Sequence, residues 1–94
     1  MSKILIIDDE VQIRKLLARM MELEGYEVCQ AGDCKSAMKQ LELQAPDVVL
    51  CDVFLPDGNG VDLVLSLKKA SPHAEVILLT AHGNIPDGVQ AIKN

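Results

Sequence analysis

The chain has 94 residues, and 49% of them are hydrophobic, which is enough for one packed domain and too many for a disordered chain. The formal net charge of −5 argues against a surface for nucleic acid or anionic lipid, because both are bound through clustered Lys and Arg. No apolar run approaches the roughly 20 residues that cross a bilayer, and the apolar run near the N-terminus is too short for a signal peptide. We therefore expect a single cytoplasmic domain over residues 1–94.

The three cysteines are Cys29, Cys34 and Cys51. Their number is odd, they form no CxxC pair, and no histidine lies near them in the sequence. This pattern is typical of reduced, mostly buried small side chains and not of a zinc site or a disulfide framework.

Four apolar segments alternate with four helical patterns along the chain. The predicted strands cover residues 3–8, 26–31, 47–52 and 75–81. Their nearly continuous apolar character indicates burial on both faces, as in a parallel sheet that is covered by helices. Right-handed crossovers between such strands give an open α/β sheet.

The first two predicted helices have clear boundaries. The first carries apolar residues at helical spacing and ends before Gly25; these residues are Ile13, Leu16, Leu17, Met20 and Leu23. The second begins at Asp33 or Ser36, buries Ala37 and Leu41, and ends before Pro46.

The other two predicted helices lie in the second half of the chain. The third contains Val61, Val64, Leu65 and Leu67 and ends before Pro72. The fourth begins near residue 85, with Pro86 in its first turn and Val89 and Ile92 facing inward. Residues 90–94 contain no helix stop signal, so we expect the chain to end as a cut within or just after this helix.

Acidic residues follow two of the predicted strands. Asp8 and Asp9 come after the first strand, and Asp52 ends the third. The carboxyl ends of parallel strands share one edge of the sheet, so these side chains should converge in a crevice there. Two unit charges about 4 Å apart repel by roughly 4 kcal/mol at an effective dielectric constant near 20. A raised carboxyl pKa relieves this repulsion, and so does a divalent cation such as Mg²⁺.

The sequence after the first strand, Asp8 to Glu10, also narrows the class of ligand. It lacks the glycine-rich turn that cradles a nucleotide phosphate, and its charge repels a phosphate that arrives without metal. Asp52 is then the natural nucleophile for a phosphoryl group, and Thr80 at the end of the fourth strand faces the same crevice. The simpler interpretations are a helix N-cap for Asp8 or Asp9 and an ordinary strand position for Thr80.

Residues 53–60, VFLPDGNG, predict a loop. Pro56, Gly58 and Gly60 are typical of a tight connection. The alternative that stays open is a loop shaped to present the Phe54 carbonyl to a metal.

Together these residues resemble the receiver domain of two-component response regulators. The resemblance rests on the Asp8–Asp9 pair after ILII, on LCDVFLPDGNG around Asp52 and on LLTAHG around Thr80, and it covers essentially the whole chain. TAHGNIP is similar in particular to receivers of nitrogen-regulatory, enhancer-binding regulators. The resemblance implies a flavodoxin-like open parallel sheet with strand order 2-1-3-4-5.

The resemblance also implies roles for individual residues. Asp52 would accept a phosphoryl group from a histidine kinase, and Mg²⁺ would be held by Asp8, Asp9, Asp52 and the Phe54 backbone carbonyl. Thr80 would be the switch hydroxyl. Such a chain is a self-phosphorylating signalling domain with weak autophosphatase activity, and it acts on an output domain without itself contacting nucleic acid or membrane.

The sequence departs from the family pattern at its end. The fifth strand, which carries a phosphate-contacting Lys, and the fifth helix are absent, and Lys93 lies within the predicted fourth helix. We therefore expect a complete acidic metal site but impaired phosphoryl transfer and switching. We also expect an open edge on the fourth strand and an uncovered helix-packing surface, which favour homodimers.

Two other functions are compatible with an aspartate at the end of a parallel strand. A phosphatase of the haloacid-dehalogenase kind needs a second Asp two residues after its nucleophile, whereas Phe54 follows Asp52 and Glu10 follows Asp8 at that spacing. This pattern is a poor match. A dimerisation or interaction module that uses the receiver scaffold without phosphorylation stays open.

Overall fold

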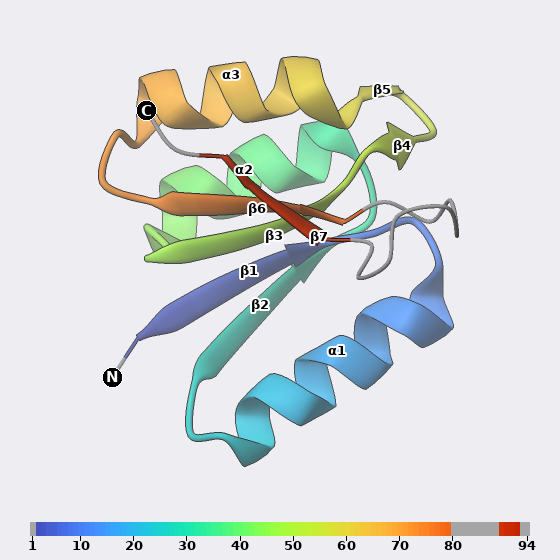
Figure 1. Ribbon diagram of the computed structural model, residues 1–94, viewed down its shortest axis with the longest axis vertical. Helices are drawn as coiled ribbons and strands as arrows, with labels where there is room; N and C mark the ends of the chain where they lie inside the picture. The colour runs from blue at the N-terminus through green and yellow to red at the C-terminus, as the bar shows by residue number, and fades with distance from the viewer. Residues whose placement is uncertain (1, 80–88, 93–94) are drawn as a thin grey trace.

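Five strands form one sheet in the computed structural model, which describes residues 2–79 and 89–92. The strands lie in the order β2-β1-β3-β6-β7 (Figure 1). Their bounds are β1 Lys3–Ile7, β2 Glu27–Ala31, β3 Val48–Asp52, β6 Glu75–Leu79 and β7 Val89–Ile92. The first four are parallel to one another, which confirms the predicted flavodoxin-like open sheet.

Helices cover the sheet from both sides. Helix α1 (Val11–Leu23) packs on one face, and α2 (Cys34–Gln44) and α3 (Gly60–Ala70) pack on the other (Figure 1). Among the helices of residues 2–79 and 89–92, none combines the length and apolar character that a bilayer span requires.

The four parallel strands are mostly apolar because each contributes to two cores. In β1, Leu5 and Ile7 point toward α2 and α3, whereas Ile4 and Ile6 point toward α1. This alternation follows from the two-residue period of a strand and explains why the predicted strands show no polar face.

Local signals set the ends of the first two helices as predicted. Helix α1 ends at Leu23, and Gly25 follows with a φ of +95°, a left-handed conformation that glycine adopts at little cost. Helix α2 begins after Asp33, whose carboxylate accepts the Ser36 N–H at 2.7 Å. The Ser36 hydroxyl in turn accepts the Asp33 N–H at 3.3 Å and completes a capping box.

The inner face of α1 includes only one of the five apolar residues that repeat at helical spacing, Leu17. Ala18 is the buried residue of this helix, and Leu17 and Met21 pack beside it. The other four periodic residues are exposed, with 42% of Ile13, 61% of Leu16, 48% of Met20 and 70% of Leu23 accessible. Apolar residues occur on two adjacent sides of α1, so helical periodicity alone does not tell which side meets the sheet.

The predicted loop at residues 53–60 contains a small hairpin. Strand β4 (Phe54–Leu55) pairs antiparallel with β5 (Gly58–Asn59), and α3 begins directly afterwards. The tight connection predicted from Pro56, Gly58 and Gly60 is therefore confirmed.

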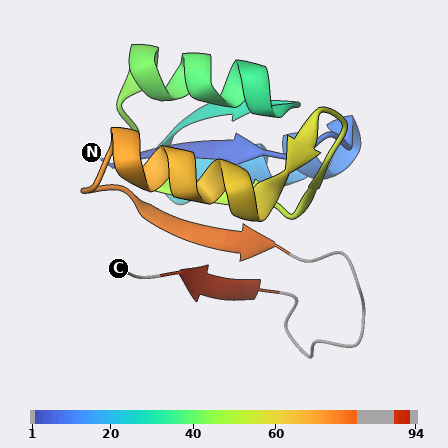
Figure 2. The ribbon, with the colours of Figure 1, turned by 90° about the horizontal axis from the view of Figure 1, so that it is seen from above.

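The predicted fourth helix is wrong at its described end. Residues 89–92 form strand β7, which runs antiparallel to β6 with Val89 opposite Leu79 (Figure 2). The start near residue 85 and Pro86 lie outside the described residues. A short helix is marginal by itself, whereas strand pairing supplies partners for the edge N–H and C=O groups of β6. The expectation of an open edge on the fourth strand is wrong for the same reason.

Helix α3 offers a matched test of this packing. Leu67 is fully buried between α3 and the sheet, whereas 67% of Leu65 is exposed. We expect Leu67→Ala to lower the free energy of unfolding by about 2–5 kcal/mol, because it leaves a cavity, and Leu65→Ala to change it by less than about 0.5 kcal/mol. Urea unfolding followed by circular dichroism measures both, and equal losses would contradict the assigned inner face.

Candidate functional site

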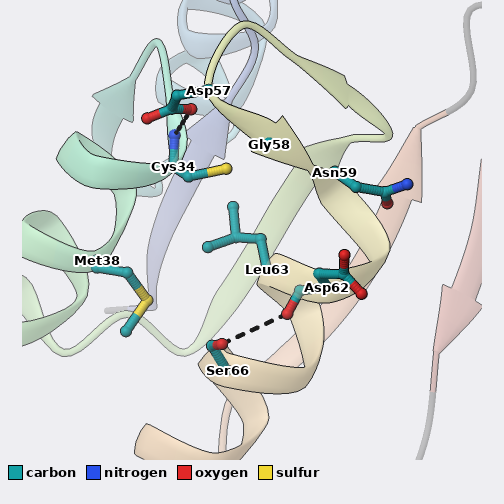
Figure 3. Close-up of a pocket in the computed structure, with 8 residues that line it drawn as sticks. All are labelled: Cys34, Met38, Asp57, Gly58, Asn59, Asp62, Leu63 and Ser66. Atoms are coloured by element: carbon teal, nitrogen blue, oxygen red, sulfur yellow. Dashed lines mark hydrogen bonds between the residues drawn. The ribbon is translucent and has the colours of Figure 1, made fainter.

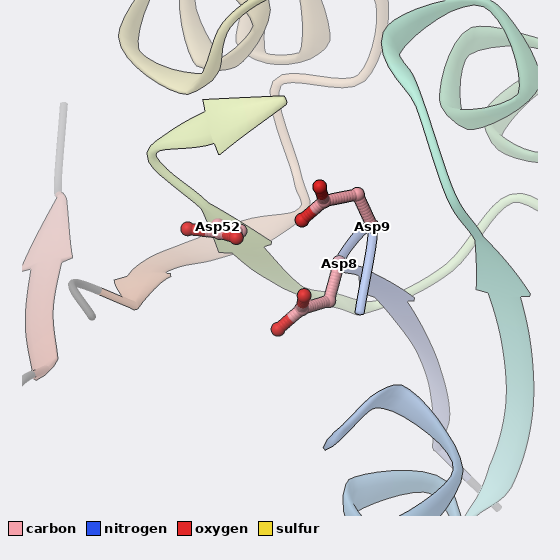
Figure 4. A group of neighbouring side chains, drawn as sticks. All are labelled: Asp8, Asp9 and Asp52. Atoms are coloured by element: carbon pink, nitrogen blue, oxygen red, sulfur yellow. The ribbon is translucent and has the colours of Figure 1, made fainter. Parts of the chain in front are cut away.

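Three carboxylates meet at the carboxyl end of the sheet. Asp8, Asp9 and Asp52 each offer an oxygen, and these oxygens all lie within 4.8 Å of one another. Figure 4 shows Asp8 and Asp9 directly after β1 and Asp52 on the neighbouring β3, with the three side chains gathered in one space. The predicted convergence of these aspartates is confirmed.

Asp8 is fixed by backbone contacts on both sides. Its N–H donates to the Ala31 carbonyl at 3.1 Å, which extends the β1–β2 ladder by one residue. Its buried carboxylate accepts the Glu10 N–H at 2.9 Å. The N-cap position of α1 belongs to Glu10, whose side chain makes no capping bond. Neither Asp8 nor Asp9 is therefore the N-cap of α1, which removes the simpler interpretation of this pair.

Arg14 supports the same segment from α1. One guanidinium nitrogen donates to the Asp8 carbonyl at 2.9 Å, and Nε donates to the Gln30 side chain at 3.1 Å. A Cβ at Gly32 would lie 2.9 Å from this guanidinium, so a residue without a side chain leaves room for it. Nothing in the sequence singles out Arg14, because helical spacing carries no information about a partner on another element.

Asp52 ends β3 with only 8% of its surface exposed. Burial raises the pKa of its carboxyl, and the charges of Asp8 and Asp9 raise it further. The Phe54 N–H donates a hydrogen bond to the Asp52 Oδ1 at 3.2 Å, and this bond lowers the pKa of the carboxyl. The carboxylate is thus held in one orientation and kept more basic than an exposed aspartate.

The donor set fits a hard divalent cation. Mg²⁺ prefers oxygen ligands and binds few protein groups, and the cluster consists of carboxylates alone. A cation among them would also remove the repulsion that raises the pKa of Asp52.

The backbone after Asp52 turns sharply. The Gly60 N–H donates to the Val53 carbonyl at 2.6 Å, and a Cβ on Gly60 would collide with the Asp52 carbonyl oxygen. Glycine is therefore required at residue 60. The turn places Phe54 at the start of β4, two residues beyond Asp52, while the role of the Phe54 carbonyl as a ligand stays a prediction.

Other predicted residues have different outcomes. Thr80 and Lys93 lie outside the described residues. All three cysteines are free, as expected, but only Cys51 is fully buried. Burial is the main cause that raises the pKa of the Cys51 thiol to about 12 and that of Cys34 to about 11, so neither supplies a thiolate at neutral pH.

The family model of the response regulator receiver domain matches residues 4–94. The chain belongs to this family. It is therefore a receiver domain of two-component response regulators, a class of signalling domain, and the relatives named below are transcriptional regulators.

Two curated relatives illustrate the sequence similarity of this receiver domain. The chain is 35% identical over 89 residues to the probable transcriptional regulatory protein TcrX of Mycobacterium tuberculosis, and this match covers 95% of the chain and 38% of TcrX. It is 35% identical over 92 residues to the nitrogen assimilation regulatory protein NtrX of Azorhizobium caulinodans, covering 96% of the chain and 20% of NtrX. The receiver domain thus spans well under half the length of either regulator.

Two solved structures share its fold. The response regulator TrrA of Thermotoga maritima, in complex with Mg²⁺ and BeF, has a TM-score of 0.83 and 34% identity, covering 92% of this chain and 75% of TrrA. A response regulator of Burkholderia pseudomallei, with a phosphorylated aspartic acid, a calcium ion and citrate, has a TM-score of 0.84 and 29% identity, covering 90% of this chain and 50% of that one. Receiver domains similar to this chain have therefore been crystallised with divalent cations.

The raised pKa of Asp52 predicts how the metal-free domain responds to pH. Ionising a carboxyl whose folded pKa lies above its ordinary value of 3.8 costs stability, and this cost grows as pH rises through the folded pKa. Asp52→Asn keeps the acceptor for Phe54 but removes the charge. We expect it to raise the melting temperature at neutral pH by several degrees, given that about 1 kcal/mol corresponds to roughly 4–8 °C in a domain of this size.

Thermal unfolding in EDTA at a series of pH values tests this expectation. The gain should shrink as pH falls toward the ordinary carboxyl pKa. Asp62→Asn is the control, because Asp62 is exposed in the first turn of α3 and its loss should not stabilise the domain. A gain for Asp52→Asn that does not depend on pH would contradict the electrostatic explanation.

Proposed function

We propose that Asp52 accepts a phosphoryl group from a phosphohistidine of a histidine kinase. The observation that supports this proposal is the Asp52 carboxylate itself, which is buried, has a raised pKa and lies beside the carboxylates of Asp8 and Asp9. The phosphorylated aspartic acid of the Burkholderia pseudomallei relative supports it, because that chain shares the fold of this one. On this proposal, residues 1–94 act as one receiver domain.

The transfer is a substitution at phosphorus. A carboxylate oxygen of Asp52 forms a bond to phosphorus while the bond from phosphorus to the imidazole nitrogen breaks, and the electron pair stays on that nitrogen. The product is an acyl phosphate on Asp52 and a free histidine on the kinase. The Phe54 N–H orients the Asp52 carboxylate, and burial among apolar strands limits the access of water.

Asp8, Asp9, Asp52 and the Phe54 carbonyl would hold Mg²⁺. When bound, it neutralises negative charge on the transferred group. The residues of the chain set the geometry of this pocket, because Glu10 and Arg14 restrain Asp8 through its carboxylate and its carbonyl. The Mg²⁺ in the TrrA structure supports this choice of cation.

The response to phosphorylation would come from Thr80. Its hydroxyl is proposed to move toward the phosphoryl group and to pass the change to an output domain. The family resemblance supports this role, as it supports slow loss of the acyl phosphate by hydrolysis.

Phosphorylation by a small donor tests the central proposal. With acetyl phosphate and Mg²⁺, we expect the intact mass of the wild-type chain to increase by one phosphoryl group, and Asp52→Asn to show no increase. Asp9→Asn, which removes one charged ligand, should slow labelling on the order of tenfold or more, since each 1.4 kcal/mol of lost interaction is a factor of ten.

EDTA and Asp62→Asn provide the controls for this experiment. EDTA should abolish labelling, whereas Asp62→Asn removes a carboxylate outside the cluster and should label at the wild-type rate. Labelling of Asp52→Asn equal to that of the wild type would refute the assignment of the acceptor.

A second candidate function, an interaction module, is favoured by the exposed stripe of α1. We propose that Ile13, Leu16, Met20 and Leu23 form a contact with a second copy of the chain, because an apolar stripe of this kind marks interaction surfaces. Light scattering over a range of concentrations should show association that the double variant Leu16→Lys, Leu23→Lys weakens about tenfold or more without loss of fold. A wild-type monomer at the highest concentration would contradict this contact.

A further inference from the structure

The tip of the β4–β5 hairpin contacts the start of α2, away from the acidic cluster. Asp57 lies in this turn, and its two carboxylate oxygens accept backbone N–H groups from the first turn of the helix. The Cys34 N–H donates to Oδ1 at 2.7 Å (Figure 3). The Lys35 N–H donates to Oδ2 at 3.1 Å. Two segments that are 22 and 23 residues apart in the chain are thereby joined.

This contact completes the cap of α2. The first N–H groups of a helix have no partner within the helix. Asp33, the N-cap residue, accepts only the Ser36 N–H among them, and Asp57 accepts those of Cys34 and Lys35. The positive end of the helix dipole also favours a carboxylate at this place.

The hairpin and the helix approach each other closely. A Cβ at Gly58 would lie 2.9 Å from the Cys34 sulfur, so a larger residue there would force the Cys34 side chain to shift. Burial, together with the nearby Asp57 carboxylate, raises the pKa of the Cys34 thiol to about 11, so the thiol is protonated at neutral pH. The Cys34 and Lys35 N–H groups hold the pKa of Asp57 below its usual range, so this carboxylate is charged at neutral pH. A groove of about 320 Å³ between α2 and α3 adjoins the contact (Figure 3).

The other end of the same hairpin is fixed to the acidic site. The Phe54 N–H donates to the Asp52 carboxylate, and the Gly60 N–H donates to the Val53 carbonyl. Along the chain, only Leu55 and Pro56 lie between Phe54 and Asp57, and only Gly58 and Asn59 lie between Asp57 and Gly60. Because so few residues intervene, we expect a shift of Asp57 to displace Phe54 as well.

We propose that Asp57 is a positioning residue that anchors the β4–β5 hairpin on α2 and thereby holds the Phe54 backbone beside the Asp52 carboxylate. The anchoring stands on the hydrogen bonds alone. Its consequence for Mg²⁺ rests on the proposed function, in which the Phe54 carbonyl is a ligand.

The competing explanation is that Asp57 only stabilises α2. Asp33→Ala separates the two, because it removes a cap from the same helix but leaves the bonds of the hairpin in place. Asp57→Ala removes the anchor, and Asp57→Asn, which keeps one acceptor, is a milder form in case the alanine variant folds poorly. Asp62→Asn, across the groove, controls for the loss of one negative charge.

Amide hydrogen exchange of the metal-free chain, followed by NMR, is the deciding measurement. We expect Asp57→Ala to speed exchange at Phe54 and Gly60 by about tenfold or more, and Asp57→Asn by less, while Asp33→Ala and Asp62→Asn leave these two amides within about twofold of the wild type. Equal effects of Asp57→Ala and Asp33→Ala at Phe54 and Gly60 would overturn the proposal.

Mg²⁺ titration of the same variants adds the functional readout. We expect Asp57→Ala to weaken Mg²⁺ binding by about tenfold, the effect typical of residues that orient ligands, and Asp33→Ala to leave it unchanged. A wild-type chain that is not labelled by acetyl phosphate would refute the proposed function, whereas the exchange rates would still decide whether Asp57 anchors the hairpin. Faster exchange in Asp57→Ala with unchanged Mg²⁺ affinity would confine the anchor to a structural role and overturn its link to the site.

Discussion

The repulsion among Asp8, Asp9 and Asp52 is the constraint on which the rest of the site depends. Parallel strands end at one edge, and the pairing of β1 with β3 puts these carboxylates within 4.8 Å of one another. Burial of Asp52 strengthens the effect, because a charge with little water around it interacts more strongly with its neighbours. The fold maintains this unfavourable arrangement with the free energy of its two apolar cores, which is typical of a functional site.

Backbone hydrogen bonds hold the carboxylates against this repulsion. Asp8 is restrained through Glu10 and Arg14, and Asp52 is restrained through the Phe54 N–H. Asp57 extends the same support outward, since it joins the hairpin that carries Phe54 to the first turn of α2. Each of these contacts fixes the orientation of a carboxylate or of the backbone beside it, as the proposed metal site would require.

The sequence predicted the strands and the acidic cluster well because both follow from local rules. Apolar runs such as 48–51 permit little besides a strand buried on two faces, and strand ends in a parallel sheet share one edge. The inner face of α1 was not predictable in this way. Its apolar residues lie on two sides, and the choice of Ala18 over Leu16 depends on the shape of the sheet beneath it.

The sequence by itself therefore determined the open sheet, the end of α1 before Gly25 and the meeting of three aspartates, because each depends on residue type and chain order; for the start of α2 it left Asp33 and Ser36 open, and the structure has Asp33 as the cap. Tertiary structure decided that residues 89–92 pair with β6 as strand β7 and do not form the predicted helix. The edge of β6 provides hydrogen-bond partners for this segment, and local helix or strand propensities contain no information about them. Tertiary structure also decided the contacts of Arg14 and Asp57, whose partners lie on other elements. The sequence defines which hydrogen-bonding groups a side chain has, but the packing of helices and strands determines which partners lie close enough to bond with it.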